Sequence, residues 1–305
     1  MIRLSRLLLL TAALVAAAAS APPAGASRAE PRMIDQEPED CDEFVPASAG
    51  ISGITDDGQA VSLDVQVVLD FAEGVQIERL RREAAAEADP DRAAELAAQA
   101  EALHQTQVDR ALGLLDASVG SYAPLDVEFA MIGFDYLAPL NEDGTVRNRT
   151  TDAAEINQLA KDQYEGARPE GADVVYVLTD LDIQLPGLGN LVAGLADCIG
   201  GVRYPGRAFA VGEIADDIPI GPVTFYYEAT AKIAAHEIGH LMGAHHHYQN
   251  CVEGIPTELE AGEPSPCTLM TNFVDFQSLN FGQIEAAVVR GHAVDFASEN
   301  DPEAG

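Results

Sequence analysis

The chain has 305 residues, 47% of them hydrophobic, and its 17 lysine and arginine residues are far outnumbered by 50 aspartate and glutamate residues. The net charge of -33 argues against nucleic-acid binding and against binding to anionic membranes, because both need clustered cations. The hydrophobic content is too high for a disordered acidic chain, so we expect a buried core.

The first 26 residues have the pattern of an export signal. Arg3 and Arg6 precede an apolar run from Leu7 to Ala19, and the small residues Ala24-Gly25-Ala26 follow it. The run is short for a membrane span, and no later stretch is apolar over the roughly 20 residues that a span requires. We therefore expect cleavage after Ala26 and a secreted, extracellular protein with no membrane anchor.

Residues 27–57 are rich in proline, glutamate, aspartate and serine and show no periodicity, so we interpret them as a short pro-segment or an N-terminal arm. Alternating apolar residues from Val61 to Phe71 then predict a strand. A helix follows from about Gln76. Asp89-Pro90 has the pattern of an N-cap followed by proline at the first helical position, and predicts a second helix that runs to about Ser118.

Three further strands are predicted downstream. Residues 125–131 alternate between apolar and polar, Val174 to Leu178 are continuously apolar, and Ala208 to Ile214 form another candidate. Strands that alternate with helices indicate an α/β fold with a largely parallel sheet. Near the C-terminus, Asn280 and Gln283 resemble a capping pair for a closing helix, whose apolar positions include Ile284 and Phe296.

The most informative segment is a cluster of histidines between residues 236 and 246. On a helix, His236 and His240 are four residues apart and project from one face, where two imidazoles can bind one zinc ion. Gly243 can take the left-handed conformation that ends a helix and bring His246 back as a third ligand. His245 and His247 flank this residue and are alternatives in principle, but the spacing favours His246.

The spacing H-E-x-x-H-x-x-G-x-x-H resembles the zinc signature of the metzincin metalloendopeptidases, and other segments extend the likeness to their adamalysin (reprolysin) members. Residues 267–271 are similar to the methionine turn beneath the metal, with Met270 as its methionine. Gly194, Leu195 and Ala196 are similar to the antiparallel edge strand that binds substrate. His247 and Asn272 depart from the pattern, since adamalysin-like members carry aspartate at the first position and astacin-like members tyrosine at the second.

The resemblance implies a twisted, mostly parallel sheet with an antiparallel edge strand, an active-site helix carrying the motif, a methionine turn and a C-terminal helix. It implies a zinc metalloprotease catalytic domain over residues 58–300 that binds one catalytic Zn²⁺ through His236, His240 and His246. Peptide bonds would be hydrolysed by a zinc-activated water with Glu237 as the general base. The alternatives are a catalytically inactive binding module that retains the metal, and a zinc hydrolase of non-peptide amides.

The expected partners are protein or peptide substrates, and we expect a monomer. An extended peptide can add to the edge strand whatever its sequence. Asp197 beside this edge either favours a cationic substrate residue or is a solvated charge that prevents edge-to-edge aggregation. Calcium is a possible second ion, with Asp180, Asp182, Asp216 and Asp217 as candidates, but no spaced ligand loop supports it.

The four cysteines form an even set, which in an oxidising compartment suggests two disulfides. Cys251 and Cys267 bracket the segment between the third histidine and Met270 and are expected to pair. Cys41 and Cys198 are then left over. They either form the second bridge, or Cys41 is a thiolate that caps zinc in a latent precursor; cysteine parity favours the bridge.

Overall fold

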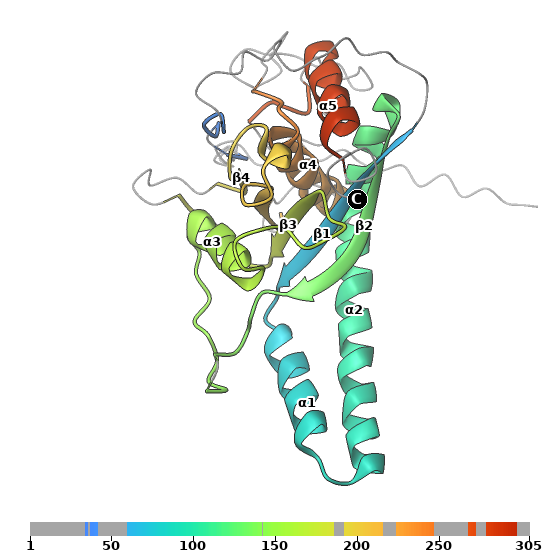
Figure 1. Ribbon diagram of the computed structural model, residues 1–305, viewed down its shortest axis with the longest axis vertical. Coiled ribbons are helices and arrows are strands. Elements are labelled where there is room, and N and C mark those ends of the chain that lie inside the picture. The colour runs from blue at the N-terminus through green and yellow to red at the C-terminus, as the bar shows by residue number, and fades with distance from the viewer. Residues whose placement is uncertain are drawn as a thin grey trace, which may run out of the picture. The chain divides into compact units, whose positions relative to one another are not determined.

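Five strands form one sheet in the computed structural model, in the order β2-β1-β3-β5-β4 (Figure 1). Strand β1 pairs in parallel with β2 and β3, β3 pairs in parallel with β5, and β4 is antiparallel to β5. The strands are β1 Val61–Asp70, β2 Val127–Tyr136, β3 Val174–Thr179, β4 Gly194–Ala196 and β5 Phe209–Glu213. This is the expected α/β sheet, mostly parallel with one antiparallel edge strand.

The helices are α1 Gly74–Ala86, α2 Pro90–Tyr122, α3 Ala153–Gln163, α4 Thr224–Leu241 and α5 Gln283–Phe296, with short 3₁₀ helices at Ala123–Leu125 and Gly201–Arg203. Helices α2 and α4 pack on one face of the sheet and α3 on the other (Figure 1). Alternate residues of β3 divide between these faces: Tyr176 lies in the α2 and α4 core, whereas Val175 and Val177 lie in the α3 core. Because both faces are covered, all six residues of β3 are buried.

The structure describes residues 34–35, 37–41, 60–141, 143–185, 192–215, 224–246, 268–272 and 279–297, with the backbone alone for 224–228. All of them belong to one compact unit, Pro31–Gly305. Several predictions therefore concern residues outside the described ranges, namely the export signal, His247, Asp216, Asp217 and the Cys251–Cys267 bridge. Among the described helices, none combines the length and apolar composition needed to cross a membrane.

The start predicted for the second helix is confirmed. The Asp89 side chain accepts hydrogen bonds from the backbone N–H groups of Asp91 and Arg92, and Pro90 is the first residue of α2. Helix α2 ends at Tyr122, four residues later than expected. It stops there because Pro124, two residues further on, cannot continue the helix. The second strand also differs, since Leu125 lies in a 3₁₀ helix and β2 extends to Tyr136.

The expected cap of the C-terminal helix is wrong. Helix α5 begins at Gln283, and its N-cap is Gly282, which provides no side-chain hydrogen bond. The backbone C=O of Asn280 instead accepts a hydrogen bond from Leu269 N–H at 2.7 Å. This bond connects Asn280 to the turn that contains Met270. Ile284, expected in the core, is 65% exposed.

Candidate metal centre

Helix α4 passes through the core and carries two of the three candidate ligands. Its alanine-rich segment from Ala229 is buried, as are His236, Glu237 and His240. The four-residue spacing places both imidazoles on one side of the helix, with their Nε2 atoms 3.1 Å apart. The pair is therefore held in place by the packing of α4.

The turn after α4 brings the third histidine back toward the first two. Gly243 has a φ of +87°, a conformation that glycine adopts without strain. Ala244 N–H donates to Gly239 C=O and Gly243 N–H to His240 C=O, both at 2.9 Å, which is the Schellman pattern of helix ends. As a result, His246 Nε2 lies 3.3 Å from His236 Nε2.

Hydrogen bonds at the opposite ring nitrogens set the orientation of two imidazoles. His236 Nδ1 lies 2.9 Å from Leu269 O, and His240 Nδ1 lies 2.7 Å from Ala244 O. A carbonyl only accepts, so both Nδ1 atoms carry the proton and both Nε2 atoms are left as acceptors. Two acceptors 3.1 Å apart cannot bond to each other, and a shared cation would satisfy both of them.

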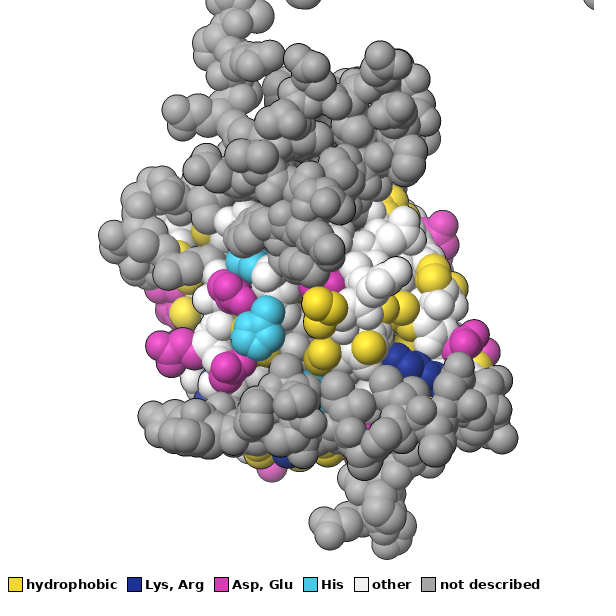
Figure 2. Space-filling model, turned by 90° about the horizontal axis from the view of Figure 1, so that it is seen from above, with side chains coloured by type: hydrophobic (Ala, Val, Ile, Leu, Met, Phe, Trp, Pro, Cys, Tyr) yellow, Lys and Arg dark blue, Asp and Glu magenta, His cyan; other side chains and the backbone are white. Residues whose placement is uncertain are grey.

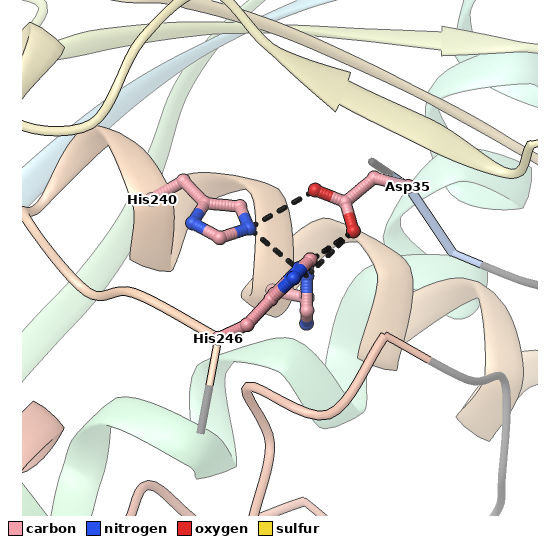
Figure 3. Close-up of side chains that lie close together, drawn as sticks. Asp35, His240 and His246 are labelled. Atoms are coloured by element: carbon pink, nitrogen blue, oxygen red, sulfur yellow. Dashed lines mark hydrogen bonds and ion pairs between the residues drawn. The ribbon is translucent and has the colours of Figure 1, made fainter. Parts of the chain in front are cut away.

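The donor set fits zinc in both number and spacing. Zinc binds imidazole nitrogen at about 2.0–2.1 Å in tetrahedral sites, which places ligand atoms about 3.3 Å apart. The observed separations of 3.1 and 3.3 Å match this value. A fourth residue that the sequence prediction missed, Asp35, joins the group, and the ligand atoms of all four residues lie within 4.8 Å of one another (Figure 3).

Glu237 lies where the candidate metal centre meets the edge strand. It is fully buried, and a Cβ added at Gly194 of β4 would be 2.3 Å from its Oε1 atom. Only glycine therefore allows the backbone of β4 to approach the carboxylate so closely. Burial raises the pKa of Glu237 well above its usual value, and the nearby charge of Asp35 raises it further.

The turn around Met270 contacts the helix that carries His236 and His240. Thr271 N–H donates to Thr268 C=O at 3.2 Å, and the C=O of Leu269 in this turn orients His236. Met270 is fully buried, and its sulfur would be 2.9 Å from a Cβ added at Gly239 in α4. Met270 is therefore packed against the helix that carries the ligands.

His245 does not join the three converging histidines. Its side chain is 47% exposed, and its Nδ1 lies 3.0 Å from a carboxylate oxygen of Glu37. Its Nε2 lies 3.3 Å from Asp40. Figure 2 shows one face of the molecule on which exposed histidine and acidic side chains lie together.

The remaining predicted groups have mainly structural contacts. Cys41 and Cys198 form a disulfide with a Cα–Cα distance of 5.2 Å, so the alternative of a Cys41 thiolate on zinc is wrong. Asp197 is not a solvated charge, because it forms ion pairs with Lys161 at 2.5 Å and with Arg207. Asp180, a calcium candidate, pairs with Arg149.

The metal-free protein should lose stability in acid because of His236. Burial lowers the pKa of His236 to about 4, although the Asp35 carboxylate opposes the shift. In the unfolded chain the same imidazole binds a proton near pH 6.5, so its contribution is complete above pH 6.5 and is lost as the pH falls toward 4. We expect a loss of about 3 kcal/mol at pH 4. Urea unfolding of chelator-treated protein would measure it, and an equal pH dependence in His236→Gln would contradict the assignment.

A protein-family model matches the part of the chain that carries the three histidines. Residues 101–247 match the family model of reprolysin-like metallopeptidases, family M12B. Archaemetzincin from Methanopyrus kandleri is 18% identical, with a TM-score of 0.37 over 78% of this chain and 98% of that one. Archaemetzincin from Archaeoglobus fulgidus, solved with malonate, is 16% identical, with a TM-score of 0.36 over 74% and 99%. A search of curated proteins gave no match. The chain therefore carries a reprolysin-like metallopeptidase domain of family M12B, a family of zinc hydrolases.

Proposed function

We propose that the protein is an exported zinc endopeptidase in which His236, His240 and His246 hold one catalytic Zn²⁺. The observation that carries the proposal is the convergence of three Nε2 atoms, two of which carbonyl groups fix as acceptors. When bound, zinc would supply a Lewis acid that acidifies water and polarises a carbonyl group. Export and cleavage after Ala26 rest on the sequence pattern of the first 26 residues.

Glu237 is the proton carrier in this proposal. Burial raises its pKa, which makes the carboxylate a stronger base, so it can accept a proton from the attacking water and return it to the leaving amine. Strand β4 would hold the substrate, because an edge strand offers N–H and C=O groups to an extended peptide. The short distance between Gly194 and Glu237 would bring the peptide bond to the base.

A caseinolysis assay with and without a chelator tests the proposal. Zinc-loaded protein should degrade denatured casein, lose that activity with the chelator, and recover it when zinc is returned. Zinc-containing protein that cleaves no peptide would favour a binding module, and cleavage of simple amides alone would favour a non-peptide hydrolase. The N-terminal sequence of protein recovered from the medium tests cleavage after Ala26.

Substituting alanine for Gly194 should separate catalysis from metal binding. The added Cβ would overlap the Glu237 carboxylate, so we expect turnover to fall at least about tenfold with unchanged zinc content. Gly120→Ala in α2 is the matched control, because no atom lies within 4 Å of its added Cβ. Full turnover in Gly194→Ala would show that the position of Glu237 beside β4 is unimportant.

A further inference from the structure

In the N-terminal segment 34–41, the described residues 34–35 and 37–41 lie directly against the candidate metal centre. Ile34 C=O accepts hydrogen bonds from Ala193 N–H at 2.6 Å and Gly194 N–H at 2.8 Å. Its own N–H donates to Asn272 C=O at 2.7 Å, two residues beyond Met270. Ile34 is fully buried and therefore links the edge strand to the methionine turn across the site.

Asp35 places its carboxylate among the three histidines (Figure 3). Its Oδ1 atom lies 2.8 Å from His246 Nε2 and 3.3 Å from His236 Nε2, and its Oδ2 atom lies 3.0 Å from His240 Nε2. The side chain is completely buried. A carboxylate oxygen is an ordinary zinc ligand, and these distances are those between neighbouring ligand atoms in a tetrahedral site.

The rest of the segment runs along the substrate edge. Ile199 N–H donates to Glu39 C=O at 3.0 Å, and Cys41 N–H donates to Ile199 C=O at 3.1 Å. These bonds form a parallel bridge between Asp40 and Ile199, and the disulfide to Cys198 fixes the segment there. The backbone groups that would pair with an extended peptide near β4 are thus partly used by the chain itself.

We propose that residues 34–41 are an internal inhibitor of the site, with Asp35 as a fourth metal ligand in the position that water needs. The proposal rests on the proposed function, since it requires zinc on the three histidines and substrate at β4. Four protein ligands close a zinc site, whereas a catalytic site keeps one position open. The metal would bind the side-chain carboxylate of Asp35 and not a backbone carbonyl group. No peptide bond of the segment would therefore be polarised for cleavage.

The disulfide determines which cut activates the enzyme. A cut after Cys41 leaves the segment attached to Cys198, at a high effective concentration beside the metal. A cut between Asp35 and Cys41 separates Asp35 from that tether, and the short piece that carries it can dissociate. Activating proteolysis would therefore cut one of the six peptide bonds between Asp35 and Cys41.

Calorimetric titration with acetohydroxamate, a small bidentate zinc ligand, tests whether the fourth position is closed. We compare the zinc-loaded full chain with Asp35→Asn and with Glu39→Gln, which makes the same chemical change on an exposed side chain of the same segment. Asp35→Asn should bind the probe at least about tenfold more tightly, because the competing ligand is lost. Glu39→Gln should bind like the wild type.

Equal affinity in Asp35→Asn and Glu39→Gln, with zinc present in both, would overturn the inhibitor and leave the proposed function intact. A wild-type chain that takes up no zinc would overturn the proposed function and the inhibitor with it. The double variant Cys41→Ser, Cys198→Ser keeps Asp35 but no longer fixes residue 41 beside residue 198, and should show an intermediate affinity. An affinity equal to that of the wild type would contradict the role of the disulfide.

Discussion

Replacing Glu237 with glutamine should reduce peptidase turnover by about 10³-fold or more and leave the zinc content unchanged. General acid–base catalysis contributes roughly 10²–10⁴-fold, and Glu237 would act twice in each cycle, once on the attacking water and once on the leaving amine. Glutamine keeps the shape of the side chain against Gly194 but cannot accept the proton. Zinc content should persist, because Glu237 is not among the four converging ligand residues.

Casein turnover and elemental analysis of the same preparation measure the two effects together. Glu128→Gln is a suitable control, since this glutamate is exposed on β2. Loss of both zinc and turnover in Glu237→Gln would mean that Glu237 supports the metal, and full turnover would assign the base to another residue. Either result would contradict the proposed mechanism.

The parts of the site predicted from the sequence are those whose geometry is local. Residues 236 to 246 lie on one helix and its terminal turn, so spacing alone places the two imidazoles together and identifies Gly243 as the residue that turns the chain. The buried strand β3 was evident for a similar reason, because both of its faces need apolar residues.

Asp35 was not predicted because its role depends on contacts across 211 residues of sequence. It lies in no regular element, and an aspartate in an acidic, proline-containing segment resembles a solvated residue. Only the fold shows that Ile34 anchors to Ala193 and Asn272 and so directs the next side chain toward the histidines. Asp35 falls within residues 27–57, which the sequence pattern marks as a pro-segment or arm, but nothing in that pattern points to a metal ligand.

Helix α3 was missed for a different reason. It has 11 residues, of which only four are buried, so its apolar pattern is weak. The sequence feature that could have predicted α3 lies at its N-terminus. There the Asp152 side chain accepts hydrogen bonds from Ala154 N–H and Glu155 N–H, as an N-cap does. An N-cap aspartate followed three residues later by glutamate was therefore the feature to weigh.

His246→Ala should weaken zinc binding more than about 100-fold, whereas His245→Ala should leave it nearly unchanged. Loss of a residue that merely orients a ligand costs about 10–100-fold in metal affinity, and loss of one of three imidazoles should cost more. His245 is the matched control, because it is the adjacent histidine in the same turn but is 47% exposed and paired with Glu37 and Asp40. Competition with a chromogenic chelator measures both affinities.

Comparing His246→Ala with His245→Ala also tests whether zinc binding depends on the turn after α4 or only on the number of nearby histidines. If any nearby imidazole sufficed, His245 would rotate inward and His246→Ala would keep its zinc. The Schellman turn at Gly243 opposes this, because it directs His246 toward His236 while His245 stays exposed. Undiminished zinc in His246→Ala would mean that His236, His240 and Asp35 hold the ion without His246, since the two Asp35 carboxylate oxygens lie 3.3 Å from His236 Nε2 and 3.0 Å from His240 Nε2.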